Sequence, residues 1–115
     1  MTDRFVEVVK ADDLPEKKIF CTAADGVALA VVKVKGSFYA VENQCSHAAA
    51  TFDDGRLRAF HIICPLHGGM FDVRTGAGAG PPARRPIRAF PTRVNGDGMV
   101  EVNIDNPLPF EQPSP

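Results

Sequence analysis

Short apolar runs separated by turn signals make up most of this chain, and helical periodicity is nearly absent. Asp25-Gly26 and Lys35-Gly36 each stand between two such runs, and a sequence Asp-Gly is one of the strongest short-range hairpin signals. The segments that we predict to hold strands are residues 5–9, 19–22, 27–34, 37–41, 56–64, 70–73, 89–94 and 99–104. Short strands at this even spacing predict an all-β fold of antiparallel strands, either a sandwich or a barrel.

Two segments fall outside this pattern. Residues 76–82 are rich in glycine and proline and have few side chains to pack, so we expect an exposed loop there. Residues 105–115 contain four prolines and cannot pair as an interior strand. We therefore expect one domain over residues 1–104, followed by an extended tail over residues 105–115.

Composition and charge argue against several classes of protein. The 115 residues are enough for one domain with a modest core. A net charge of −1 gives no electrostatic reason to bind nucleic acid. No apolar run approaches the roughly 20 residues that span a bilayer, and residues 1–5 lack the features of a signal peptide. We expect a soluble, cytoplasmic monomer without nucleic-acid or membrane partners.

Two short motifs combine cysteine with histidine. Cys45 and His47 are separated by one residue, and Cys64 and His67 by two. These motifs use two of the three cysteines and two of the three histidines in the chain, which is improbable by chance. Because a disulfide framework is unattractive in a reducing compartment, the pattern indicates a metal site.

The spacing of the first motif bears on which metal is bound. Thiolates and imidazoles suit both zinc and iron–sulfur clusters. Structural zinc usually needs two to four residues between paired ligands, and here only Ser46 lies between Cys45 and His47. In an extended segment such a pair faces one way, about 6–7 Å apart, and can straddle two metals. This favours a two-iron cluster with cysteines on one iron and histidines on the other, while a zinc site stays open.

These residues resemble the Rieske [2Fe–2S] ferredoxins of bacterial aromatic-ring-hydroxylating dioxygenase systems. The two ligand loops of that family match residues 45–47 and 64–68, and the resemblance covers about residues 4–104. Further matching features are Phe71-Asp72, Thr75-Gly76, Pro81-Pro82 and the hairpin through Asn95–Gly98. The resemblance implies a Rieske fold of stacked antiparallel sheets, with the cluster at the tip of a small subdomain over about residues 43–84.

The resemblance also implies a role for each ligand. Cys45 and Cys64 would hold the inner iron of one cluster per chain, and His47 and His67 would hold the outer iron near solvent. The respiratory-complex type of Rieske protein adds a cysteine to each loop, and the two form a disulfide. The matching positions here are Ala50 and Leu66, so that brace is absent.

The function that follows from the resemblance is one-electron transfer from an NAD(P)H-dependent flavin reductase to a terminal oxygenase. Catalysis of oxygenation would need a second metal, typically iron on two histidines and a carboxylate. Only His61 remains once the cluster is built, so we expect an electron-transfer component and not an enzyme. The alternatives are a Rieske-like small subunit of a larger reductase, of the nitrite-reductase kind, and a zinc-stabilised interaction module.

The remaining cysteine and histidine have simpler interpretations. Cys21 lies in a predicted strand, and we expect a buried free thiol. His61 lies in an apolar stretch, and we expect a partly buried structural residue.

Overall fold

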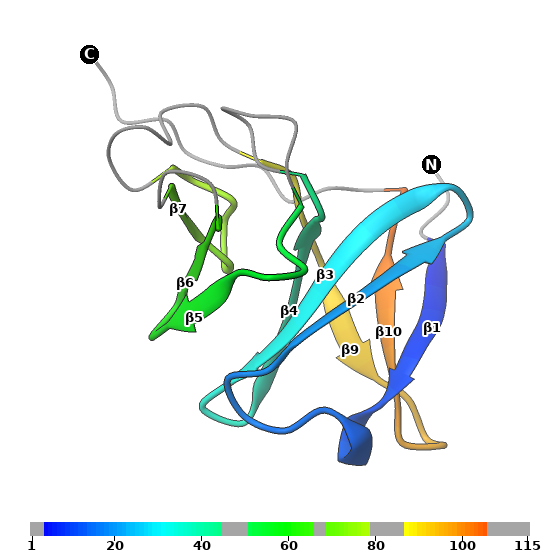
Figure 1. Ribbon diagram of the computed structural model, residues 1–115. Helices are drawn as coiled ribbons and strands as arrows, with labels where there is room; N and C mark the ends of the chain where they lie inside the picture. Colours follow the sequence, from blue (N-terminus) through cyan, green and yellow to red (C-terminus); the bar gives the residue numbers. More distant parts are fainter. Residues whose placement is uncertain (1–3, 45–50, 66–68, 79–86, 106–115) are drawn as a thin grey trace.

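The computed structural model describes residues 4–44, 51–65, 69–78 and 87–105 (Figure 1). Its elements are β1 (Phe5–Lys10), the 3-10 helix η1 (Ala11–Asp13), β2 (Ile19–Ala24), β3 (Val27–Val34), β4 (Ser37–Glu42), β5 (Arg56–Arg58), β6 (His61–Ile63), β7 (Met70–Asp72), β8 (Ala89–Phe90), β9 (Thr92–Val94) and β10 (Met99–Asn103). The prediction of an all-β fold with stacked antiparallel sheets is confirmed. No helix among these residues is long and apolar enough to cross a membrane.

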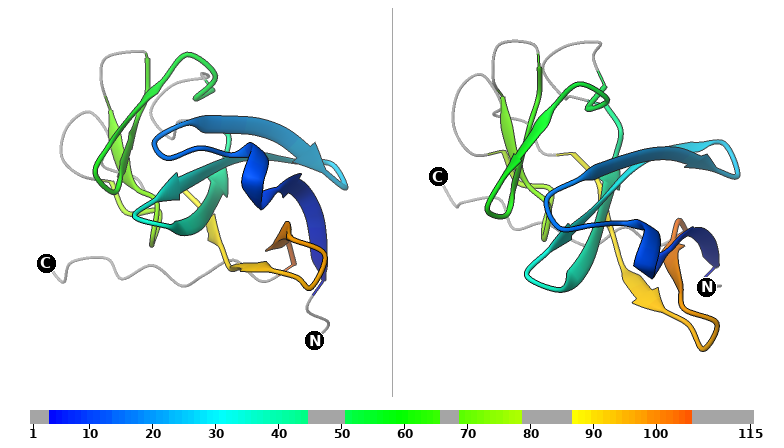
Figure 2. Two further views of the ribbon diagram at one scale, coloured as in Figure 1. Left: turned by 90° about the horizontal axis from the view of Figure 1, so that it is seen from below. Right: turned by 60° about the horizontal axis from the view of Figure 1, so that its bottom comes forward.

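The strands form three antiparallel sheets, with the orders β1-β10-β9, β2-β3-β4-β8 and β5-β6-β7. The four-stranded sheet lies between the other two (Figures 1 and 2). Two tight hairpins build most of this central sheet, and in each the two turn residues have positive φ: Asp25-Gly26 at 51° and 84°, and Lys35-Gly36 at 51° and 81°. Such turns match the right-handed twist of the flanking strands, and both were predicted from the sequence.

β3 is nearly continuously apolar because both of its faces are buried. Ala30, Val32 and Val34 belong to a first core cluster with residues of the β5-β6-β7 sheet. Leu29 and Val31 belong to a second cluster with residues of β1, β10 and β8. The alternation of side chains along a strand therefore makes β3 the shared wall of two cores.

Two predicted strands are wrong in detail. Residues 89–94 form two strands and not one, because Pro91 has no N–H to donate and interrupts the ladder. β8 pairs with β4 and β9 pairs with β10, so this proline lies where the chain passes from one sheet to another. Residues 56–64 form the β5-β6 hairpin, which turns at Ala59 with a φ of 52°.

The prediction of an exposed loop over residues 76–82 is also wrong at its first residue. Gly76 is buried, and its φ is 83°. A Cβ atom at this position would overlap the carbonyl oxygen of Ile87, so the backbone of the two segments can approach only because the residue is glycine. Residues 79–82 and the tail beyond residue 105 lie outside the described part of the chain.

Candidate metal centre

Cys64 directly follows β6, in the hairpin that β6 forms with β7. Ile63 and Met70 are the last paired residues of this hairpin. One step further, the backbone N–H of Cys64 donates to the carbonyl oxygen of Gly69 at 2.7 Å. The side chain of Cys64 is 1% exposed and packs in the first core cluster. The hairpin thus holds Cys64 immediately before residues 65–68, which we call the second segment; the first, residues 44–51, is described next. We call the residues on either side of such a segment its base. The second segment carries His67, which lies outside the described residues.

A side chain closes the base of the first segment, residues 44–51. This segment carries Cys45 and His47, which lie outside the described residues. Immediately before it, the backbone N–H of Asn43 donates to the Ala28 carbonyl oxygen at 3.0 Å, which extends the pairing of β4 with β3. The side-chain oxygen of Asn43 accepts a hydrogen bond of 2.7 Å from the backbone N–H of Phe52. Asn43 therefore joins the two ends of the first segment.

A third segment, residues 77–86, is closed by backbone hydrogen bonds. The N–H of Ile87 donates to the Gly76 carbonyl oxygen at 2.8 Å, and the Gly76 N–H donates to the Asp72 carbonyl oxygen at 2.6 Å. Pro81 and Pro82, which are among the features that match the family, lie in this segment, outside the described residues.

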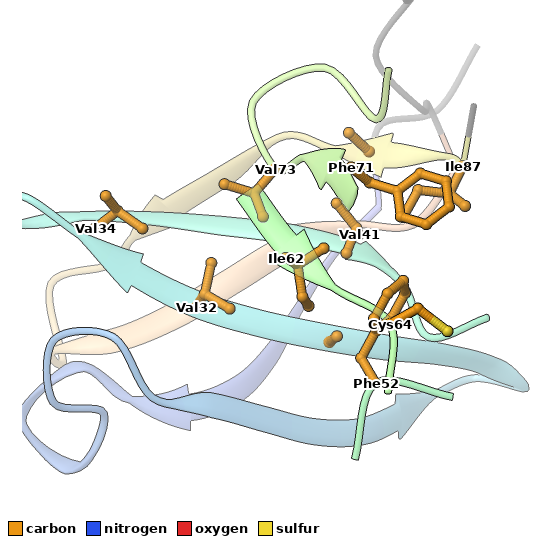
Figure 3. Packing of buried hydrophobic residues seen from close by; sticks show 11 residues of the cluster. Val32, Val34, Val41, Phe52, Ile62, Cys64, Phe71, Val73 and Ile87 are labelled. Carbon is orange, nitrogen blue, oxygen red and sulfur yellow. The ribbon is translucent and has the colours of Figure 1, made fainter. Parts of the chain in front are cut away.

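The bases of the three segments meet in the first core cluster. The rings of Phe52 and Phe71 pack edge to face, with 5.8 Å between their centroids and 81° between their planes. Figure 3 shows Phe52, Cys64, Phe71 and Ile87 gathered at one end of the cluster, away from Val34. The fold therefore brings together the chain on both sides of each predicted ligand motif.

This end of the molecule suits an iron–sulfur cluster in its donor set and its surroundings. The sequence places one thiol and two imidazoles within the first and second segments, and a second thiol, that of Cys64, at the base of the second segment. Thiolate ligands are normal for such clusters, and imidazole replaces two of them on one iron in the Rieske type. The buried thiol of Cys64 lies among apolar side chains that exclude water, which is one of the means by which a protein tunes a metal group.

Cys21 has a different environment. It is half-buried, and not fully buried as the sequence predicted. Burial and a hydrogen bond to the Asp53 carboxylate raise the pKa of the Cys21 thiol to about 12. A metal ligand must be a thiolate, so this neutral thiol is a poor candidate. The assignment of the other two cysteines as ligands stays a prediction.

Asp53 and Asn43 were missed by the sequence analysis. Asp53 accepts a hydrogen bond of 2.8 Å from the Thr51 hydroxyl and one of 3.4 Å from the Asn43 side-chain amide. Hydrogen bonds from Cys21, Thr51 and Asn43 hold the pKa of the Asp53 carboxyl below its ordinary value. The only signal in the sequence was that both polar residues lie close to the first motif.

His61 is partly buried, as predicted. It lies opposite Asp72 in the β6-β7 pair, and its charge is one of the influences that lower the pKa of that carboxyl. Among the residues that the structure describes, no group of three or more histidine, cysteine or acidic side chains could hold a metal ion. A structural role for His61 stays a prediction.

Comparison with known proteins bears directly on the site. The profile of the Rieske [2Fe–2S] domain matches residues 4–91. The ferredoxin component of the naphthalene 1,2-dioxygenase system of Pseudomonas aeruginosa is 36% identical over 100 residues, which cover 87% of this chain and 96% of that protein.

Solved structures give the same result. The ferredoxin of carbazole 1,9a-dioxygenase from Nocardioides aromaticivorans IC177 is 38% identical with a TM-score of 0.81, over 91% of this chain and 97% of its own. A chain from the complex of reduced oxygenase and oxidized ferredoxin in carbazole 1,9a-dioxygenase is 35% identical, with a TM-score of 0.81. The match covers 89% of this chain and 94% of that one. A putative NADH-dependent nitrite reductase small subunit from Mycobacterium tuberculosis has a TM-score of 0.80 over 89% of this chain and 96% of its own, but its 19% identity shows the fold alone.

Proposed function

This chain belongs to the Rieske [2Fe–2S] domain family, and from this premise we propose that it carries single electrons to a terminal ring-hydroxylating oxygenase. When bound, the [2Fe–2S] cluster supplies a centre that accepts and releases one electron at a time. The family membership makes the zinc interpretation wrong. The relatives are ferredoxin components of dioxygenase systems, so the chain is an electron-transfer component and not the oxygenase.

We assign the cluster to Cys45, His47, Cys64 and His67. The observation that carries this assignment is the position of Cys64, which is buried in the core cluster that also holds Phe52, next to the first segment, and Phe71, in the strand after the second. In the proposed arrangement the two cysteines hold an inner iron, and the two histidines hold an outer iron near solvent. A fully ligated cluster has no open position for a substrate, which agrees with a carrier.

The electron acceptor and the electron donor of this chain are also proposals. The complex between a reduced oxygenase and an oxidized ferredoxin in the carbazole system supports a terminal oxygenase as the electron acceptor. We propose an NAD(P)H-dependent flavin reductase as the donor, because a one-electron carrier needs a source that splits the two electrons of a hydride. We also propose that the chain works as a monomer in the cytoplasm.

Metal analysis of alanine variants tests the ligand assignment. The purified protein should contain two irons and two acid-labile sulfides per chain and should be red-brown. Replacing Cys45, His47, Cys64 or His67 by alanine should abolish the ordinary cluster. Cys21→Ala and His61→Ala are matched controls for the two residue types and should keep the visible spectrum. The assignment is wrong if Cys21→Ala loses iron while Cys45→Ala keeps it.

Electron transfer in trans tests the function. A flavin reductase with NAD(P)H should reduce the purified chain, and the reduced chain should then reduce a separately purified terminal oxygenase. Transfer should depend on the concentration of the chain, because a carrier dissociates between its two partners. If the chain purified only as a permanent subunit of a larger reductase and reduced no oxygenase, the proposal would be wrong.

A further inference from the structure

The base of the first segment differs from the other two in that a side chain closes it. Residues 65–68 and 77–86 are each bounded by a backbone hydrogen bond. Residues 44–51 are bounded by the bond from the Phe52 N–H to the side-chain oxygen of Asn43, at 2.7 Å. Asn43 is 8% exposed, and a buried amide is retained at low cost only when its hydrogen bonds are made. The side chain therefore has a specific task at this position.

The other end of the Asn43 amide leads to a small network. Its nitrogen donates to one oxygen of Asp53 at 3.4 Å, and the Thr51 hydroxyl donates to the other at 2.8 Å. Thr51 and Asp53 lie on either side of Phe52, so the network holds the end of the first segment to Asn43, the residue after β4.

Phe52 connects this network to the second segment. Its ring is fully buried and packs edge to face on Phe71, in the strand that follows the second segment. Cys64 belongs to the same hydrophobic core cluster as Phe52 and Phe71. A change at Asn43 would therefore act, through Phe52, on the surroundings of Cys64, the residue that begins the second motif.

No disulfide can brace the two ligand segments of this chain. Its sequence has three cysteines, and Cys45 and Cys64 are assigned to the cluster, which leaves Cys21 alone. Other interactions must therefore hold the two segments in position relative to each other.

We propose that Asn43 is a positioning residue that, with Asp53 as its partner, fixes the segment carrying Cys45 and His47 against the one carrying Cys64 and His67. The proposal rests on the ligand assignment given above. Asn43 does not bind iron; it acts through the Phe52 backbone and the Asp53 carboxylate. Polar groups that orient metal ligands typically change metal affinity or activity by roughly 10- to 100-fold when they are removed.

A matched pair of variants separates this role from a merely structural one. Asn43 and Asn103 are the buried polar side chains of the described residues, at 8% and 2% exposure. The Asn103 oxygen accepts a hydrogen bond from the Asp105 N–H at 3.2 Å, and Asn103 ends β10, in the sheet on the other side of the central sheet from Cys64. Asn43→Leu and Asn103→Leu should both lower the melting temperature of the cluster-loaded protein.

Only Asn43→Leu should alter the [2Fe–2S] cluster. Iron should pass from this variant to a chelator roughly 10- to 100-fold faster than from the wild type, and the g-values of the reduced protein in electron paramagnetic resonance should shift. Asn103→Leu should match the wild type in both measurements. If the two variants lost iron at the same rate and gave the same spectrum, the proposal would be overturned.

A rescue experiment keeps the test decisive if Asn43→Leu does not fold. Asn43→Asp keeps an oxygen for the Phe52 N–H but sets a second carboxylate against Asp53, so iron loss should accelerate. In the double variant Asn43→Asp with Asp53→Asn, the amide and the carboxylate change places, and the rate should return to near that of the wild type. A double variant no better than Asn43→Asp would contradict the proposal.

The two proposals fail in different ways. If the wild-type protein lacked the red-brown colour and the two irons, the ligand assignment itself would be wrong. If the wild type had both and the rescue did not occur, only the positioning role of Asn43 would be lost.

Discussion

Cys21 shows how a single side chain is tuned by its surroundings. Burial raises the pKa of its thiol to about 12 from an ordinary 9.0, and the Asp53 carboxylate adds to the shift. Only the thiolate reacts with alkylating reagents, so at pH 8 the reactive fraction falls on the order of a thousandfold. The residue is therefore expected to be chemically inert although it is only half-buried.

We expect iodoacetamide at pH 8 to label Cys21 in the folded, cluster-loaded protein on the order of a thousandfold more slowly than in the unfolded chain. Mass spectrometry of the peptide containing Cys21 measures the rate. Asp53→Asn removes the negative charge that disfavours the thiolate, so labelling should be faster in that variant. Equal rates in the folded and unfolded protein would show that the thiol is not held neutral.

Gly76 and Gly26 give a second prediction at this scale. Both have positive φ, 83° and 84°, but a Cβ at Gly26 would meet nothing within 4 Å, whereas one at Gly76 would overlap the Ile87 carbonyl oxygen. Gly26→Ala should lower the free energy of unfolding by about 1 kcal/mol, the cost of the backbone conformation alone. Gly76→Ala should cost about 3 kcal/mol or more, because the two backbones must also separate. Urea denaturation measures both, and equal losses would contradict this account.

At the scale of elements, the turn after β7 links Asp72, Arg74 and Phe60. The Asp72 carboxylate accepts hydrogen bonds from the Arg74 backbone N–H at 2.8 Å and from its guanidinium at 2.8 and 3.0 Å. The guanidinium lies over the Phe60 ring, 4.1 Å from its centroid. Burial alone would raise the pKa of Asp72, but the hydrogen bonds and the charge of Arg74 outweigh it and lower the pKa below 3.8.

This shift predicts the sign of a pH dependence. Because the pKa is lower in the folded state, the ionised carboxylate stabilises the fold above pH 3.8, and this contribution is lost as the pH falls through the folded-state pKa. Asp72→Asn should cost about 1 kcal/mol of unfolding free energy at pH 7, since the pair is partly screened by solvent. The difference from the wild type should shrink below pH 3.8. Asp97→Asn, an exposed residue with no ion pair among the described residues, serves as the control and should change little at any pH.

The elements that the sequence predicted correctly are those with purely local signals. The two hairpins formed by β2, β3 and β4 follow from short apolar runs and the turn residues Asp25-Gly26 and Lys35-Gly36 between them. Residues 89–94 were predicted as one strand because apolar pattern alone does not tell which sheet each half joins. The turn at Ala59 was missed because it has none of the residues that favour positive φ.

At the scale of the whole molecule, one part of the site could be predicted from the sequence and another part could not. Its ligand motifs are visible in the sequence because their spacing is local. Cys64 lies in the core cluster at the base of the second segment, and its role as a ligand stays a prediction. Asn43 and Asp53 could not be predicted, because the hydrogen bonds that join them across the first segment exist only in the folded chain.

The place where the oxygenase docks is a property of the whole molecule. Electron transfer needs a short path, so we expect the partner to contact the end of the molecule where the bases of the three segments meet. Met70 begins β7, two residues after the second segment ends, and is partly buried. Val94 ends β9 in the sheet on the other side of the central sheet, and it is 48% exposed. Figure 1 shows β7 and β9 far apart.

We therefore expect Met70→Glu to slow electron transfer to the terminal oxygenase by about tenfold or more, because a buried charge at the centre of an interface must lose its water. Val94→Glu introduces the same charge away from this end and should stay close to the wild-type rate. Stopped-flow reduction of the oxygenase, at matched iron content and with both variants fully reduced beforehand, measures the docking effect apart from damage to the cluster. Equal slowing by the two variants would mean that net charge, and not the surface beside the cluster, governs the encounter.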